Sequence, residues 1–187
     1  MSKVIRLVPY QADWPDTYRR LAAGLAEALP PGACLHHIGS TAIPGMTAKD
    51  VIDLQATVDR LEDVAGDRLA GLGWIDRPGR VDHQPAGQRL DPAECTKRYF
   101  TLAAPAAHLH IRERGRFNQR YALLFRDFLR ADPAAAAAYQ AVKAALVDHT
   151  GGDPAAYYAV KDPVCDAIMA GAEAWARSTR WQVPPGD

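Results

Sequence analysis

The alternation of hydrophobic and polar positions along the first two thirds of the chain predicts strands and helices in turn. Apolar side chains recur at helical intervals over residues 16–29, and Pro30-Pro31 ends that pattern. An apolar run at 34–38 predicts a strand that stops at Gly39-Ser40, and residues 51–58 resume a strand pattern after a loop. By the same criteria we expect strands at 5–8, 99–103 and 109–112, a helix at 61–72, and a mobile loop rich in Pro, Gly and charge at 77–92.

The last third of the chain changes to helical patterns, at 120–129, 133–149 and 154–177, separated by Asp-Pro and Gly-Gly breaks. This order predicts an α+β (α/β) fold, in which helices flank a mixed β-sheet and a helical C-terminal layer follows. With 187 residues and 48% apolar composition, the chain can bury one core. We therefore expect a single domain over residues 1–180, and a Pro/Gly tail at 181–187 that frays.

Composition narrows the classes of partner. The 22 basic and 22 acidic side chains balance, so we expect no nucleic acid partner. No apolar run approaches the ~20 residues of a membrane span, and the first residues do not form a signal peptide, so we expect a cytoplasmic protein without a membrane partner. Cys34, Cys95 and Cys165 lack CxxC or Cys/His spacing, and we expect them to be inert thiols.

The segment that leaves the strand at 34–38 carries the most chemistry. The Gly39-Ser40 turn offers backbone N–H groups and a hydroxyl suited to phosphate oxygens, and Asp53 on the next strand offers a carboxylate for a divalent cation. Thr41 and Lys49 are candidate partners for phosphate or for Asp53. The alternative is an ordinary turn and a solvated carboxylate. Asp53 lies inside an apolar run, where an unpaired carboxylate is costly to bury, and this favours the functional interpretation.

A second group of polar residues alternates along the predicted strand at 109–112. His108, His110 and Arg112 would point to one face of the strand, at spacings of roughly 7 Å. The histidines are candidates for metal ligands, phosphate donors or acid/base groups, and Arg112 for phosphate binding. The alternative is a solvated polar face.

Other basic side chains are candidates for clamping phosphate. Arg98 and Arg126 have the bidentate guanidinium groups that suit such a role, although Arg126 could equally form a surface or helix-end ion pair with Asp127 or Asp132. Lys161 is also a candidate, with a solvated lysine as the alternative. His36 and His37 alternate faces before the Gly-Ser turn, so at most one of them would face a pocket there.

Several of these segments together resemble the GrpB family. The similar stretches are HIGSTAIPGMTAKDVIDLQATV, LVPYQADWP and FRDFLRADP, with His108-Leu109-His110 and the Tyr-x-x-Lys that ends at Lys161. They cover the chain from Val4 to about Ala170. The segments AKDVIDLQ and YALLFRDFLRADP are most similar to those of GrpB domains fused behind dephospho-CoA kinase in some bacteria. This chain has no GxxxxGKS/T kinase loop.

The resemblance implies a nucleotidyltransferase-like fold, whose enzymes place Gly-Ser before a strand with two acidic residues one position apart and a third on a later strand. Gly39-Ser40 and Asp53 match that pattern, and His108 and His110 fall where the later-strand residue is expected. Asp53, His108 and His110 are thus the implied catalytic residues, with Asp53 and His110 as ligands of Mg²⁺ or another divalent cation. Gln55 occupies the second acidic position, and a neutral amide weakens a two-metal centre.

Three functions remain open on this basis. The first is binding of ATP, another nucleotide or a phosphorylated metabolite, with metal-dependent nucleotidyl or group transfer. The second is a non-catalytic module that binds a nucleotide or CoA, or assists the folding of a partner, and Gln55 favours this one. The third is an ATP-dependent enzyme that forms an acyl-adenylate and then an amide. On charge alone, Gln55→Glu or Gln55→Asp should raise the affinity for divalent cations.

Overall fold

A five-stranded mixed sheet forms the centre of the protein in the computed structural model, which describes residues 4–187. The parallel pairing of β2 with β5 lies inside the sheet, and the other neighbours pair antiparallel. In spatial order the strands are β1 (Cys34–Ile38), β2 (Ile52–Val58), β5 (Ala107–Glu113), β4 (Arg98–Leu102) and β3 (Ile75–Asp76). This arrangement, with helices flanking the sheet, is the α+β class that the sequence predicts.

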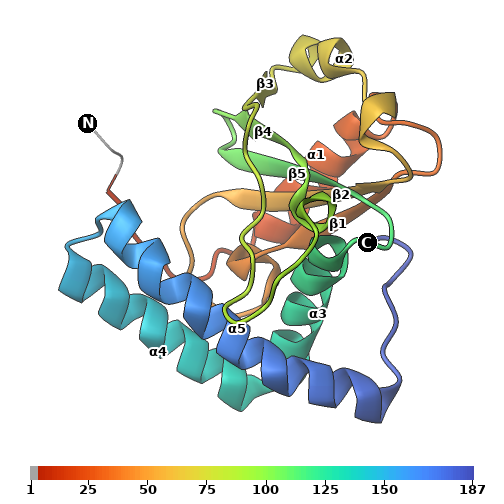
Figure 1. The fold of residues 1–187 in the computed structure, drawn as a ribbon. Coiled ribbons are helices and arrows are strands. Elements are labelled where there is room, and N and C mark those ends of the chain that lie inside the picture. Colours follow the sequence, from red (N-terminus) through yellow and green to blue (C-terminus); the bar gives the residue numbers. More distant parts are fainter. Residues whose placement is uncertain (1–3) are drawn as a thin grey trace.

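The helices divide into two groups around the sheet (Figure 1). The first half of the chain contributes α1 (Trp14–Leu25) and the short α2 (Gly66–Gly71), while α3 (Phe117–Ala131), α4 (Pro133–Thr150) and α5 (Pro154–Thr179) form the C-terminal layer. Single 3-10 turns lie at η1 (Ser40–Ala42), η2 (Leu61–Asp63) and η3 (Pro92–Cys95). No helix among residues 4–187 combines the length and apolarity that crossing a membrane requires.

The two faces of the sheet differ because side chains alternate along each strand. Leu54 of β2 and Leu109 of β5 point to one face and are fully buried with Trp14, Tyr18 and Leu25 of α1. This is the first hydrophobic core. The residues that alternate with these leucines along β2 and β5 point to the opposite face. That face lies toward the C-terminal helices and carries polar side chains.

The C-terminal layer has a hydrophobic core of its own. Leu124 and Phe128 of α3 pack with Tyr139 of α4 and Met169 of α5. The starts of α4 and α5 follow from local sequence, because each begins with a capping aspartate followed by proline. Asp132 accepts hydrogen bonds from two main-chain N–H groups of the first turn of α4, and Asp153 caps α5 by accepting from one, that of Ala156. In Figure 1 these two helices lie side by side.

Two predicted elements are wrong. Residues 5–8 form no strand and contribute only an isolated bridge between Val8 and Ala48. Residues 61–72 form η2 and α2 instead of one helix, because Val64 between them is extended and its carbonyl accepts a hydrogen bond from Arg98 Nη1 at 2.7 Å. A contact from β4 thus overrides the local helical pattern.

Candidate functional site

A cavity of about 730 Å³ lies between the polar face of the sheet, the loop before η3 and the three C-terminal helices. Gly39 and Ser40 line it where β1 ends, and Asp53, His108 and His110 line it from the two central strands. These five predicted site residues therefore share one cavity. The parallel register, which pairs Asp53 with His108, places all three strand residues on the same face of the sheet.

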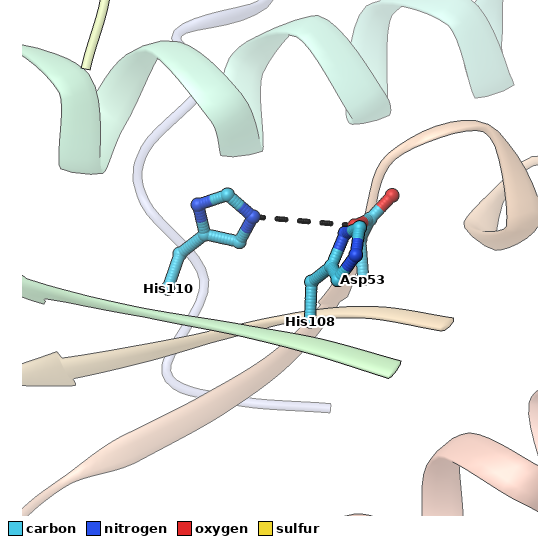
Figure 2. A group of neighbouring side chains, drawn as sticks. All are labelled: Asp53, His108 and His110. Atoms are coloured by element: carbon cyan, nitrogen blue, oxygen red, sulfur yellow. Dashed lines mark hydrogen bonds and ion pairs between the residues drawn. The ribbon is translucent and has the colours of Figure 1, made fainter. Parts of the chain in front are cut away.

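Asp53, His108 and His110 form a compact cluster (Figure 2). His108 Nδ1 lies 3.0 Å from Asp53 Oδ1, and His110 Nε2 lies 4.0 Å from the same oxygen. One potential ligand atom from each of the three residues falls within 4.8 Å of the other two. Two imidazoles and one carboxylate at this separation are a donor set that binds divalent transition metals and leaves coordination positions open.

The protonation states in this cluster suit metal binding. Burial alone would raise the pKa of Asp53, but the hydrogen bond and charge of His108, with Lys49 and His110, lower it to about 2. Burial, together with the neighbouring Arg112 and Lys97, lowers the pKa of His110 well below its ordinary value. Near neutral pH the site therefore presents an ionised carboxylate and a neutral imidazole, which are the forms that bind cations.

Gly39 brings the end of β1 against Asp53. Its φ is +71°, and a Cβ placed on it would lie 2.6 Å from Asp53 Oδ2. Only glycine fits here, because any side chain would collide with the carboxylate. The turn thereby sets Ser40 directly beside the metal-ligand candidates, where its hydroxyl accepts a hydrogen bond from Lys143 Nζ at 3.0 Å.

A buried ion-pair network lies beside the cluster on the same face of the sheet. Arg112 donates twice to Asp82, at 2.6 and 2.7 Å, and its remaining Nη1 donates to Gln55 Oε1 at 2.6 Å. Lys97 Nζ lies 2.6 Å from Asp82 and 3.3 Å from His110 Nδ1. The guanidinium of Arg112 is thus occupied by protein partners, and its role here is to hold the network together. Asp82 belongs to the loop expected to be mobile, and this pairing anchors that loop across the site.

Gln55 is fully buried and has a structural part in the same network. Its Nε2 donates to the main-chain carbonyl of Gln119 in α3 at 2.9 Å, while its Oε1 accepts from Arg112. The amide therefore connects β2 and β5 to α3 with one donor and one acceptor. A carboxylate at this position would lose the donor.

The remaining candidates divide between the cavity and other parts of the fold. Thr41 lines the cavity, but its hydroxyl bonds to the His37 ring at 2.9 Å. Lys49 and Lys161 also line it, bonded to Tyr158 OH and Asp162 respectively.

Arg98 and Arg126 lie outside the cavity and are engaged elsewhere. Arg98 pairs with Asp76 of β3 and with the carbonyl of Val64. Arg126 is buried and donates to the carbonyl of His37 and to Asp187, a residue of the predicted tail. The structure does not bring these two arginines to the phosphate-binding candidates.

Lys143 is one of several cavity residues, with Asp82 and Lys97, that the sequence did not single out. Its side chain is 2% exposed, and Nζ donates to Ser40 Oγ and, at 2.5 Å, to the carbonyl of Thr47. A lysine in an alanine-rich helix is ordinarily solvated, so nothing in the local pattern marks it. The available signal was Tyr139, which lies four residues earlier and so shares the inward face of the helix.

Comparisons with known proteins agree with this fold. A family model described as "GrpB protein" matches residues 4–171. A dephospho-CoA kinase of Mycolicibacterium paratuberculosis is 38% identical over 95% of this chain, and the chain spans about half of that relative, 48% of its length. A UPF0157 protein of Streptomyces coelicolor is 34% identical over 92% of this chain and 87% of its own.

Among solved structures, the conserved protein GrpB from Enterococcus faecalis has a similar fold, with a TM-score of 0.74 and 24% identity. The match covers 91% of this chain and 99% of that one. The family model covers most of the chain, and the Streptomyces relative matches over nearly its full length. The chain belongs to the GrpB family.

Proposed function

We propose that this protein binds a phosphorylated small molecule of the nucleotide or CoA class in the cavity, together with one divalent cation held by Asp53, His108 and His110. The observation that carries the proposal is the convergence of these three side chains on one wall of the cavity, with ligand atoms within 4.8 Å of one another. The volume of about 730 Å³ lies within the usual range for small-molecule and cofactor sites.

The relatives support the ligand class. Several relatives are named dephospho-CoA kinase, and this chain matches about half of the length of each of them. A domain joined to such a kinase has a reason to bind a nucleotide or a CoA-type molecule. The cavity provides cationic side chains for the phosphate groups of either ligand, as well as tyrosine rings for an apolar part.

Gln55 favours binding, or chemistry with a single cation, over two-metal nucleotidyl transfer. Two-metal phosphoryl transfer relies on carboxylates that bridge a pair of cations. Here the position two residues beyond Asp53 holds an amide that is buried between Arg112 and α3. The donor set with two imidazoles suits Mn²⁺, Fe²⁺ or Zn²⁺ better than Mg²⁺, because Mg²⁺ prefers oxygen ligands.

The test measures ligand-dependent stabilisation. Thermal unfolding and calorimetric titration with ATP, dephospho-CoA and CoA, each with Mg²⁺, Mn²⁺ or Zn²⁺, should show stabilisation that depends on the cation. Asp53→Asn should abolish this dependence and leave the fold intact. Asp59→Asn removes a carboxylate that is 74% exposed and lies outside the cavity, so it is the matched control. Chromatography of the same mixtures distinguishes turnover from binding.

Two outcomes would refute the proposal. If none of these ligands stabilises the wild-type protein with any of the cations, the cavity is not a site of this class. If Asp53→Asn binds cation and ligand as well as Asp59→Asn does, the cation is not held at this cluster.

A further inference from the structure

The lysines of this chain are concentrated in one place. The sequence has five lysines, and all four that the structure describes line the cavity: Lys49, Lys97, Lys143 and Lys161. The protein as a whole is neutral, with 22 basic and 22 acidic residues. The cavity is therefore a local concentration of positive charge that the overall balance conceals, and such a field attracts anions.

Three of these lysines meet at the end of the cavity formed by α4 and α5. Lys49 Nζ and Lys161 Nζ lie 5.3 and 5.6 Å from the centre of the same Tyr158 ring, so both ammonium groups flank one aromatic side chain. Lys143 Nζ lies 4.9 Å from the ring of Tyr139, and both residues belong to α4, which packs against α5. Lys97, in contrast, is paired with Asp82 in the buried ion-pair network that also contains Arg112.

Negative charge at this end does not match the positive charge. Among the described residues, Asp162 is the carboxylate that forms an ion pair with one of the three, at 3.1 Å from Lys161 Nζ. Lys143 bonds only to neutral acceptors, the hydroxyl of Ser40 and the carbonyl of Thr47. Burying an ammonium group without a counter-charge is costly. An anion bound at this cavity wall would supply the missing counter-charge.

We propose that Lys143, Lys161 and Ser40, completed by Lys49, form the subsite for the phosphoryl or diphosphate group of the ligand, separate from the cation ligands. This inference rests on the proposed function in taking the cavity as the ligand site. It assigns the anionic end of the ligand to the C-terminal helices, and it gives the Gly39-Ser40 turn the role of joining that end to the cation at Asp53.

The protonation of Lys143 provides a signature of such binding. Burial, together with the nearby Lys161 and Lys49 and against the opposing effect of Cys165, lowers the pKa of Lys143 to about 7. Lys161 and Cys165 face it from α5, Lys49 from the loop before β2, and Tyr139 from its own helix. At pH 8 most of the amine is neutral, whereas a bound phosphate dianion favours the ammonium form. Binding should therefore take up a proton.

The experiment uses inorganic pyrophosphate as the probe, with EDTA present so that no cation contributes. Calorimetric titration of the full chain at pH 8, in two buffers of different ionisation enthalpy, gives both the affinity and the number of protons exchanged. We expect Lys143→Met to weaken binding about tenfold or more, the effect of losing one charge-assisted hydrogen bond. Proton uptake by the wild type should exceed that of Lys143→Met by about one proton.

Matched variants keep the test independent of folding. Methionine fills the space of the buried lysine stem without its charge, and circular dichroism with thermal unfolding verifies the fold. Lys161→Met, at a less buried position, should also weaken pyrophosphate binding about tenfold. Arg177→Met removes one positive charge from the exposed side of the same helix, outside the cavity, and should bind pyrophosphate as the wild type does.

The outcomes separate this inference from the proposed function. Equal pyrophosphate affinity in wild type, Lys143→Met and Lys161→Met would overturn the subsite, as would an absence of wild-type binding in EDTA. If cation-dependent ligand binding then still disappears in Asp53→Asn, the proposed function survives without the lysine subsite. Should Lys143→Met not fold, the affinity of Lys161→Met and the proton uptake of the wild type decide the question.

Discussion

Gly39→Ala tests whether the end of β1 positions Asp53 as a ligand. A Cβ at this position would lie 2.6 Å from Asp53 Oδ2. Carbon–oxygen contacts of this kind settle near ~3.3 Å, so the carboxylate or the turn must move by about 0.7 Å. Metal–ligand distances tolerate only about 0.2 Å, so this displacement is enough to disturb the cluster.

The same substitution also has a cost to stability that must be separated from the cost to binding. Gly39 has φ +71° and ψ −172°, a conformation that is nearly restricted to glycine. Forcing alanine into it should lower the free energy of unfolding by roughly 1–3 kcal/mol. The displaced carboxylate should reduce the affinity for Mn²⁺ or Zn²⁺ by roughly 10–100-fold, as disturbed ligand positioning does at other metal sites.

Gly45→Ala provides the matched control. Gly45 also has a positive φ, +78°, but nothing lies within 4 Å of a Cβ placed there. Urea unfolding should therefore show a loss of stability in both variants, while calorimetric titration with the cation should show weakened binding in Gly39→Ala alone. If Gly39→Ala and Gly45→Ala bind the cation equally well, either Asp53 is not a ligand or the turn does not position it.

Three further variants test buried polar side chains around the site. Gln55→Glu should lower the free energy of unfolding by about 1–3 kcal/mol without raising divalent-cation affinity, because the buried carboxylate would lose its donor to α3 and face the already paired Arg112; tighter cation binding would contradict this, and would support the expectation from charge alone. Asp82→Asn should cost about 3–5 kcal/mol in urea unfolding, since it leaves two buried cations, Arg112 and Lys97, without their carboxylate; a change below about 1 kcal/mol would show that the network is not stabilising. Burial lowers the pKa of His37 from 6.5 to about 4, so the unfolded chain binds this proton more readily than the folded protein does. The free energy of unfolding should therefore fall as the pH drops from 6.5 to 4, by up to about 3 kcal/mol from this residue. His37→Gln should show a smaller loss over that range, and an equal loss would mean that other groups account for it.

The sequence by itself determined the polar face of the sheet and the fold class. Alternation along two strands puts Asp53 and Gln55 on one face of β2, and His108, His110 and Arg112 on one face of β5, before any coordinates are known. Helix starts were equally readable, because an aspartate followed by proline specifies its own cap through neighbouring main-chain groups. These features depend on contacts within a few residues or on the two-residue period of a strand.

Only the tertiary structure decided which charged side chains face the cavity. Arg126 has the chemistry of a phosphate clamp, yet its guanidinium donates to the carbonyl of His37, 89 residues earlier, and pairs with Asp127 and Asp187. Lys143 looks like a solvated lysine in an alanine-rich helix, yet it is buried against Ser40, 103 residues away. A guanidinium or ammonium group pairs with whatever the fold brings near it, and those partners come from distant segments. For that reason the strand pattern predicted the faces that carry Asp53 and the histidines, but the parallel pairing of β2 with β5 brings them together, and no local pattern could place the cations that surround them.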